Sequence, residues 1–350
     1  MITIAGRRIG RAHPAYIVAE LSANHHQKID EAIALVAAAR RAGADAVKLQ
    51  TYTAETMTVN SDRDGFRLDA GNTWAGRTLY DLYQEAHTPW DWHPRLQQAA
   101  RDQGIALFST PFDESSVDFL EGLAMPAYKI ASFELVDTPL LERVAGTGKP
   151  VVLSTGLATR DEIGEAVDVL RRGGCRELVL LRCASAYPAA PADMHLAAMA
   201  TLALEFGVDV GLSDHSADPA VAVAAVALGA CVVEKHVTLD RSLGGPDAAF
   251  SLEPHELGEL VRQIRTAEAA IGTDAAIPGA TAAERGNLVF RRSLIAVEDI
   301  EAGAPFTADN VRVLRPGHGL APKFLARVLG RPARRRIERG TPLSWELVGE

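Results

Sequence analysis

The feature that most constrains this chain is a regular alternation of short apolar runs and longer amphipathic runs over its first 275 residues. The short runs are nearly continuous apolar segments, as expected for parallel strands buried on both faces, and the longer runs have helical periodicity. Eight such units over roughly 250 residues predict a closed (β/α)8 TIM barrel. An open doubly wound sheet is the alternative, but the GxGxxG fingerprint usual after its first strand is absent. The predicted strands span 15–20, 45–50, 105–110, 126–132, 150–155, 178–183, 208–213 and 231–236.

The pattern changes after the barrel segment, which we place at 1–275. Residues 276–287 are rich in Gly, Ala and Thr without clear periodicity, so we interpret them as a linker. A twelve-residue pattern that begins at Ile300 recurs at Ile337, and each copy places Gly-x-Pro before an apolar residue and a Thr or Ser. Two copies are too few for a solenoid, so 288–350 is predicted to be a small pseudo-symmetric β domain.

Composition excludes several classes of protein. Three cysteines are too few for a disulfide framework and are typical of a reducing compartment, so we expect a cytoplasmic protein. The N-terminus lacks the apolar core of a signal peptide, and the longest apolar run, 220–233, is too short to cross a membrane.

Charge is distributed unevenly along the chain. The net charge is −9, yet the tail from Arg285 onward holds 12 basic and 7 acidic residues. A solvated basic face, an anion site and a self-association surface are all compatible with such a tail. Nucleic acid binding would rest only on the arginine run 334–336, so we expect none.

The carboxyl ends of barrel strands form the mouth where substrates bind, so the residues there predict a site. His215 and His236 end two neighbouring predicted strands, one strand–helix unit apart. Two imidazoles so placed can bind one divalent ion such as Mn, Fe, Co or Zn. A barrel hydrolase would typically add an HxH after the first strand, whereas Asn-His-His stands at 24–26. The segment 51–91 is too long for a simple loop and is predicted to lie over the mouth.

Basic and hydroxyl side chains end the other predicted strands and could hold a phosphorylated or carboxylated ligand. Alternatively, these lysines pair with carboxylates such as Glu20, Glu134 and Glu234 and are structural. Glu20 and Glu134 are candidates for acid–base chemistry or for anchoring a substrate. Asp247 follows the last strand and either binds a hydroxylated substrate or forms a turn, and Cys183 has no assigned basic partner and is expected to pack. The basic and hydroxyl residues of this set are Lys48, Lys129, Ser132, Ser154 and Ser213.

Taken together, motifs along nearly the whole chain resemble the sialic acid synthase family. RRSLIA (291–296), the Ile-x-x-Gly repeats and RPGHGL (315–320) resemble its antifreeze-like (SAF, β-clip) domain. The barrel motifs are AELSANHHQ (19–27), KLQTYT (48–53), FSTPFDE (108–114), YKIASFE (128–134), LSTG (153–156), CASAYPA (183–189), GLSDHS (211–216), VEKHVTLD (233–240) and GGPDAAFSLEP (244–254).

The resemblance implies an enzyme that condenses phosphoenolpyruvate with an open-chain N-acetylated amino sugar to give a nonulosonic acid. It also implies a domain-swapped homodimer and a divalent metal ion, most often Mn²⁺, with Mg²⁺ or Co²⁺ as alternatives. His215 and His236 would bind this metal and, with Glu20 and Glu134, form the catalytic set. The residues implied to hold phosphoenolpyruvate are Lys48, Thr110, Lys129, Ser132, Ser154, Ser185, Tyr187 and Ser213. Those implied to contact the sugar are Glu20, Gln50, Arg77, Glu134 and Asp247, joined by Arg315 of the partner subunit.

Departures from the family pattern bear on the acceptor sugar. The N-acetylneuraminate branch typically reads Gly-x-Asn-His-x-Gly after the first glutamate, and here Ser22 and Gln27 replace the two glycines. Residues 51–58 and 76–92 resemble instead the pseudaminic acid branch, whose acceptor is 2,4-diacetamido-2,4,6-trideoxy-L-altrose. Synthesis of N-acetylneuraminate or legionaminate is an alternative. A non-catalytic sugar-binding module would explain the tail but not the polar strand ends.

Overall fold

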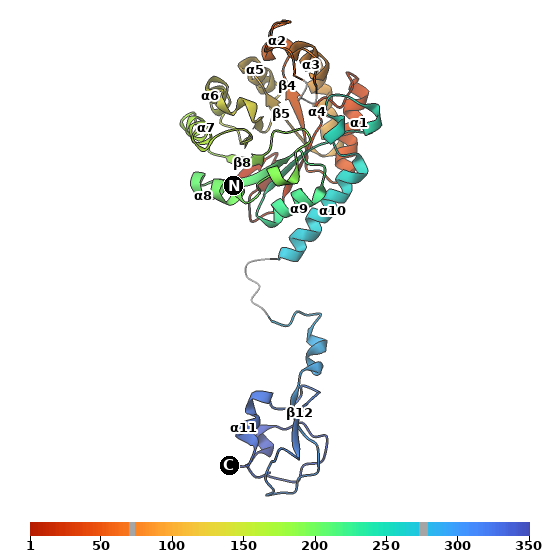
Figure 1. The fold of residues 1–350 in the computed structure, drawn as a ribbon, viewed down its shortest axis with the longest axis vertical. Helices are drawn as coiled ribbons and strands as arrows, with labels where there is room; N and C mark the ends of the chain where they lie inside the picture. The colour runs from red at the N-terminus through yellow and green to blue at the C-terminus, as the bar shows by residue number, and fades with distance from the viewer. Residues whose placement is uncertain (70–73, 273–278) are drawn as a thin grey trace. The chain divides into compact units, whose positions relative to one another are not determined.

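The computed structural model describes residues 1–69, 74–272 and 279–350. The chain forms two compact units, Met1–Gly272 and Thr273–Glu350, so the division lies close to the predicted boundary at 275 (Figure 1). Part of the predicted linker, 276–278, lies outside the described residues, and a 3-10 helix, Arg285–Phe290, begins within the rest. In the described part of the chain, no helix is long and apolar enough to cross a membrane.

The first unit is built on a closed barrel of eight parallel strands, as predicted. The barrel closes where β10 pairs with β3, with His236 opposite Glu20, and Glu20 is in turn opposite Lys48 on β4. The polar ends of neighbouring strands therefore meet at one rim. The strands are β3 (Tyr16–Glu20), β4 (Ala46–Thr51), β5 (Ala106–Pro111), β6 (Tyr128–Ile130), β7 (Val151–Ser154), β8 (Leu178–Cys183), β9 (Asp209–Asp214) and β10 (Val232–His236).

Helices surround the barrel (Figure 1). Their starts follow local capping chemistry: Asp113 and Thr159 each accept a backbone N–H of the first turn of the next helix. Gly104 and Gly207 end α4 and α8 in the left-handed conformation. The helices that alternate with the strands are α1 (Ile29–Arg41), α4 (His93–Gln103), α5 (Glu114–Gly122), α6 (Thr138–Ala145), α7 (Arg160–Arg172), α8 (Ala198–Phe206), α9 (Pro219–Ala227) and α10 (Pro254–Ile271).

Two cores hold this unit together. The larger lies between the strands and the helices, and the smaller fills the barrel interior below the polar rim with side chains such as Val18 and Phe108. A short antiparallel hairpin, β1 (Ile2–Ile4) and β2 (Arg7–Ile9), adds its isoleucines to the interior core. This hairpin closes the end of the barrel opposite the predicted site, and the sequence did not predict it.

The insertion at 51–91 contains two helices, α2 (Ala54–Met57) and α3 (Leu79–Ala86), and its residues 70–73 lie outside the described residues. Each helix begins after a threonine, Thr53 or Thr78, whose side chain accepts a backbone N–H. Met57, Leu79 and Leu82 line the pocket at the carboxyl ends of the strands. The insertion thus lies at the mouth of the barrel, as the sequence predicts.

The second unit is a small β domain in which the two copies of the sequence repeat pair with each other. Ile300 and Ile337 exchange backbone hydrogen bonds of 2.8 and 2.9 Å. Equivalent positions of the copies, such as Phe306 and Leu343, are buried in one core. The described elements include the antiparallel strands β11 (Ser293–Ala296) and β12 (Val311–Leu314) and the short helix α11 (Leu325–Val328).

Candidate active site

A pocket of about 360 Å³ lies at the carboxyl ends of the strands. Most of the residues predicted for the site contribute to its wall, because alternation along each strand turns every second side chain inward. The predicted residues on its lining are Lys48, Gln50, Lys129, Ser132, Glu134, Ser154, Tyr187, Ser213, His215, His236 and Asp247.

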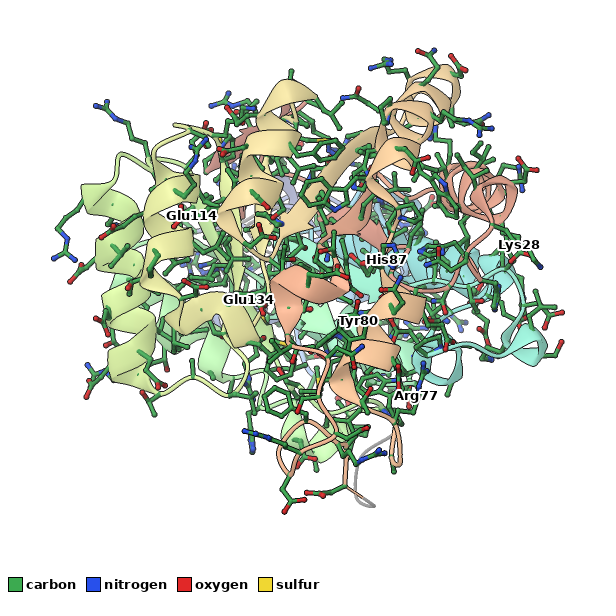
Figure 2. All side chains as sticks on the ribbon, turned by 90° about the horizontal axis from the view of Figure 1, so that it is seen from above. Lys28, Arg77, Tyr80, His87, Glu114 and Glu134 are labelled. Carbon is green, nitrogen blue, oxygen red and sulfur yellow. The ribbon has the colours of Figure 1, made fainter. Side chains whose placement is uncertain are left out.

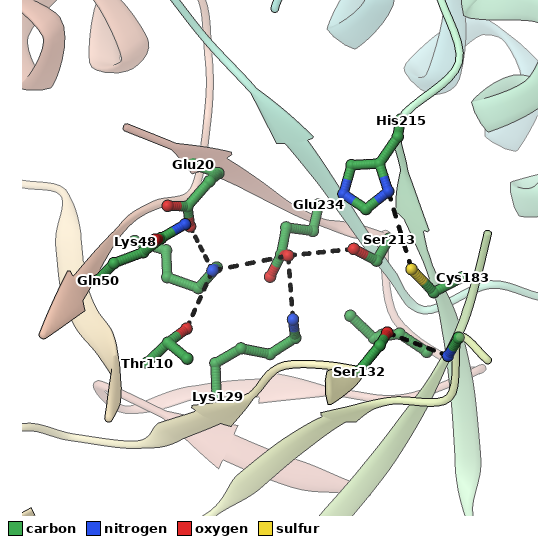
Figure 3. Close-up of polar contacts among 12 residues, drawn as sticks. Glu20, Lys48, Gln50, Thr110, Lys129, Ser132, Cys183, Ser213, His215 and Glu234 are labelled. Atoms are coloured by element: carbon green, nitrogen blue, oxygen red, sulfur yellow. Dashed lines mark hydrogen bonds and ion pairs between the residues drawn. The ribbon is translucent and has the colours of Figure 1, made fainter. Parts of the chain in front are cut away.

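The floor of the pocket is a network of buried opposite charges (Figure 3). The Lys48 ammonium pairs with Glu20, donates to Thr110 Oγ1 at 3.0 Å and lies 3.7 Å from Glu234 Oε1. Lys129 Nζ lies 3.1 Å from the same Glu234 oxygen. Both alternatives predicted for the lysines therefore apply in part, because the lysines pair with carboxylates and also line the pocket. Two ammonium groups beside two carboxylates leave this floor nearly neutral until a ligand competes for the lysines.

Burial and charge shift the pKa values of these groups in opposite directions. Burial raises the pKa of Glu20, although Lys48 opposes this shift. Burial also raises the pKa of Glu234, but the two lysines outweigh it, so its pKa lies below the usual value. Lys129 has a lowered pKa because burial disfavours its charged form. Such shifts concentrate where chemistry is done, and this supports a functional reading of the pocket.

Hydroxyl groups gather beside the lysines around Gly156. The Gly156 N–H donates to Ser132 Oγ at 3.0 Å, and a Cβ at this glycine would lie only 2.7 Å from that oxygen. Ser185 Oγ lies against the same position, although Ser185 is not among the residues that line the pocket. Ser154 Oγ is buried and has no hydrogen-bond partner within the described residues. An unpaired buried hydroxyl is costly, so this cluster is suited to bind an oxyanion.

The two predicted metal ligands lie together, with the ring centroids of His215 and His236 5.3 Å apart. His215 Nδ1 lies 3.0 Å from the Ala184 carbonyl oxygen, which orients the other ring nitrogen away from that backbone. His236 Nδ1 is buried without a hydrogen-bond partner among the described residues, and it lies 3.9 Å from Asp247 Oδ2. Burial, with positive neighbours, holds the pKa of His236 well below its usual value. A neutral imidazole with an unpaired nitrogen is the form that binds a metal.

No group of three His, Cys, Asp or Glu side chains in the described ranges could by itself hold a metal ion. A divalent ion bound by the two histidines would therefore need substrate or water oxygens for its remaining positions. Open positions of this kind are a property of catalytic metal sites rather than structural ones. The unpaired Nδ1 of His236 is the feature of the two histidines that fits such an ion.

Glu134 is a pocket carboxylate with a pKa suited to acid–base chemistry. It lies in a single 3-10 turn, Phe133–Val136, directly after Ser132 (Figure 2). Burial raises the pKa of Glu134 to about 7, and its Oε2 has no hydrogen-bond partner in the described part of the chain. A carboxyl group that titrates near neutral pH can donate or accept a proton during catalysis.

The structure does not bring every predicted residue to the pocket wall. The Arg77 guanidinium pairs with Glu85 at 2.7 Å and donates to the Asp81 carbonyl at 3.0 Å, on the α3 part of the insertion (Figure 2). Glu20 and Thr110 act through Lys48. Arg315 belongs to the second unit, where its guanidinium lies 5.9 Å from the Phe290 ring.

Other pocket residues were not predicted to belong to the site. Glu234 was predicted only as a possible structural partner of the lysines, and it both joins the two lysines and lines the pocket. Cys183 lines the pocket, and its Sγ lies 3.8 Å from His215 Nδ1, so the expectation that it lacks a basic partner was wrong. Burial would raise the pKa of this thiol, but His215 lowers it to about 7. The remaining additions are Ser22 and the aromatic residues Tyr52, Trp74 and Phe112.

A closed barrel with a lysine- and carboxylate-lined pocket at its strand ends defines a (β/α)8-barrel enzyme. The NeuB family model matches residues 35–276, and the SAF domain model matches residues 291–348. The chain therefore belongs to the NeuB family, which confirms the resemblance to sialic acid synthases.

Individual relatives agree with this membership. The chain is 42% identical over 328 residues to the pseudaminic acid synthase of Campylobacter jejuni, covering 94% of this chain and 95% of that protein. It is 37% identical to the N,N'-diacetyllegionaminic acid synthase of Legionella pneumophila, covering 97% and 96%. A crystal structure of N-acetylneuraminic acid synthetase from Leptospira borgpetersenii, in complex with citrate, is 31% identical. It superimposes with a TM-score of 0.73, covering 82% of this chain and 94% of that one.

Proposed function

We propose that this nonulosonic acid synthase condenses phosphoenolpyruvate with 2,4-diacetamido-2,4,6-trideoxy-L-altrose and water, giving pseudaminic acid and phosphate. The observation that carries the proposal is the division of the pocket into a charged floor and an apolar wall at its mouth. The 42% identity to a pseudaminic acid synthase supports the same acceptor.

The floor suits the phosphate and carboxylate of phosphoenolpyruvate. Lys48 and Lys129 supply positive charge, and Ser132 and Ser154 supply hydroxyl donors around Gly156. Phosphoenolpyruvate would then take over contacts that the lysines now make with Glu20 and Glu234. In this water-poor site, fixed donors stabilise the negative charge of the leaving phosphate more than they would in bulk water.

The wall suits a sugar with few hydroxyl groups. It is formed largely by the insertion and by aromatic side chains that flank it, with the polar Glu134 and Asp247 near by. A 6-deoxy sugar with two acetamido groups carries three methyl groups, whose burial against such a wall is favourable. The apolar residues of this wall include Met57, Leu68, Trp74, Leu79, Leu82, Ala86, Phe112 and Phe133.

The proposed reaction forms a carbon–carbon bond between the substrates and replaces the carbon–oxygen bond to phosphate with one to the oxygen of water. The methylene carbon of phosphoenolpyruvate attacks the sugar aldehyde carbon, and the aldehyde oxygen takes a proton from Glu134. Water adds to the former enol carbon, which forms a new carbon–oxygen bond, and returns a proton to Glu134. The tetrahedral centre then becomes a ketone as its bond to the bridging oxygen breaks, and the remaining hydroxyl proton leaves with the phosphate. Glu20 was an equal candidate for this role, but its pairing with Lys48 makes Glu134, with its pKa of about 7 and its unpaired oxygen, the better donor.

We assign the divalent ion, Mn²⁺ first and Mg²⁺ or Co²⁺ as alternatives, to His215 and His236. When bound there, it would polarise the sugar aldehyde as a Lewis acid. The unpaired Nδ1 of His236 and its lowered pKa support this assignment. Asp247, beside His236, would orient the sugar near the ion.

We further propose a homodimer in which the SAF unit of one chain serves the barrel of the other, with Arg315 of the partner subunit at the anionic substrate. Leu288, Val289 and Phe290 at the start of that unit are 39%, 36% and 58% exposed, as a surface covered in an assembly would be. All three cysteines are buried free thiols, which supports a reducing compartment such as the cytoplasm.

The test is phosphate release from phosphoenolpyruvate with and without the altrose acceptor. Release that requires both substrates supports the proposal. Release without any sugar would instead indicate a hydrolase, and sugar binding without release would indicate a non-catalytic module. Faster release with N-acetylmannosamine than with the altrose acceptor would reject the branch assignment.

A further inference from the structure

Ser22 lies two residues beyond the end of β3 and contacts three of the groups predicted to face the sugar. Its backbone N–H donates to Glu20 Oε1 at 2.9 Å, and its hydroxyl donates to Asp247 Oδ2. Gln50 Nε2 donates to its Oγ at 3.1 Å. The residue is only 2% exposed, yet it lines the pocket. Ser22 thus links the polar groups that are predicted to face the sugar, namely Glu20, Gln50 and Asp247.

The backbone of Ser22 adopts a conformation that disfavours any residue with a side chain. Its φ is +46°, in the left-handed region that glycine enters freely and other residues rarely occupy. Strained backbone of this kind persists where surrounding contacts hold it, and it clusters at functional sites. Here the holding contacts are those of the hydroxyl, with Gln50 on β4 and with Asp247 beyond β10. The hydrogen bonds of the Ser22 side chain therefore offset the energetic cost of its strained backbone.

The single proton of the Ser22 hydroxyl fixes which of the surrounding groups donate hydrogen bonds and which accept them. A serine hydroxyl carries a single proton, and this proton goes to Asp247. Its oxygen accepts from the Gln50 amide nitrogen, so the carbonyl oxygen of Gln50 is left to accept. The carboxylate of Asp247, which also accepts from the Ala23 backbone N–H, likewise offers only acceptor sites while it is ionised. This end of the pocket therefore offers hydrogen-bond acceptors and requires donors from its ligand.

We propose that Ser22 is a positioning residue that fixes Gln50 and Asp247 as paired acceptors for hydroxyl or acetamido N–H donors of the sugar. The inference rests on the proposed function, because it assumes an amino sugar at this end of the pocket. Ser22 has no role in the phosphoenolpyruvate floor beyond its backbone N–H, which any residue would keep. Loss of the hydroxyl should therefore weaken binding of the sugar and leave that of phosphoenolpyruvate unchanged.

The test replaces Ser22 with glycine, which removes the hydroxyl and relieves the strained φ. Ala124→Gly is the matched control, because Ala124 also has a positive φ, +52°, but lies in the loop between α5 and β6 at the opposite end of the barrel. The probe is the reduced altritol form of the acceptor, which lacks the aldehyde and cannot react. Its dissociation constant is measured by calorimetry, together with the KM values of both substrates.

Ser22→Gly is expected to raise the altritol dissociation constant and the acceptor KM about tenfold or more, as for loss of a hydrogen bond to a charged group. Its phosphoenolpyruvate KM and melting temperature should not worsen, and Ala124→Gly should leave both KM values as in the wild type. Ser22→Ala should show the same rise in the altritol dissociation constant.

Unchanged altritol binding in Ser22→Gly, or an equal rise in both KM values, would overturn the positioning role while leaving the proposed function intact. A wild-type protein that neither binds the altritol nor uses the acceptor would overturn the proposed function, and this inference with it.

Discussion

Replacing Glu134 with glutamine tests the proposed proton donor and has an effect that can be worked from the structure. The carboxyl group is largely buried, which raises its pKa from 4.5 to about 7. A shift of this size corresponds to about 3 kcal/mol between the protonated and ionised forms. Glutamine keeps the shape and a hydrogen-bonding group but can neither lose nor supply that proton.

The direction of the stability effect follows from this raised pKa. The protonated carboxyl favours the folded protein, and this contribution is fully present below about pH 4.5 and lost as the pH rises to about 7. Above that pH the wild type holds a poorly solvated charge that Glu134→Gln lacks. The variant should therefore match the wild type at pH 4.5 and be more stable at pH 8.5, by up to about 3 kcal/mol.

The catalytic activity of Glu134→Gln should fall, although its stability at high pH rises. Loss of a general acid typically costs about 10²- to 10⁴-fold in kcat, and we expect a fall of this order in Glu134→Gln with little change in either KM. The wild-type kcat should decline above about pH 7, where the donor is ionised. Phosphate release between pH 5.5 and 9 and thermal denaturation at pH 4.5 and 8.5 provide both measurements. A fully active variant, or a stability difference that does not depend on pH, would refute the reasoning.

Two further predictions concern the phosphoenolpyruvate floor and the metal. Gly156→Ala should raise the phosphoenolpyruvate KM without affecting the acceptor KM, because the new Cβ displaces the Ser132 hydroxyl. The control is Gly164→Ala, whose Cβ has ordinary space within α7, and it should leave both KM values unchanged. A normal phosphoenolpyruvate KM in Gly156→Ala would contradict the hydroxyl cradle. Rigorous chelation should abolish phosphate release. Adding Mn²⁺ should restore release in the wild type but not in His236→Ala. Full activity of the metal-free enzyme would rule out a catalytic role for the ion.

The fold could be predicted because each barrel strand is an apolar run buried on both faces. The amphipathic run 254–271 of the sequence coincides with α10, whose Pro254 start is a clear helix signal. The hairpin β1–β2 was missed because two three-residue strands leave almost no periodicity to detect. The amphipathic run 193–206 of the sequence predicts a helix that starts five residues before α8, because a separate 3-10 turn, Pro191–Asp193, precedes α8.

The site could be predicted as a set of residues but not as a set of contacts. Alternation along parallel strands placed Lys48, Lys129 and His215 at one rim, whichever partners they have. Which carboxylate joins the lysines depends on side-chain reach across the barrel, and Glu234 does so from β10. The contact between Cys183 and His215 joins residues 32 apart on neighbouring strands. Such a contact is set by register, which a single sequence does not reveal.

The most direct test of the central claim is a competition assay read by mass spectrometry. Phosphoenolpyruvate is offered with equal amounts of the altrose acceptor, N-acetylmannosamine and a stereoisomeric 2,4-diacetamido-2,4,6-trideoxyhexose whose acetyl groups are deuterated. We predict that the main product has the mass of the unlabelled altrose acceptor plus phosphoenolpyruvate and water, less phosphoric acid. A main product that is deuterated, or that derives from N-acetylmannosamine, would contradict the account.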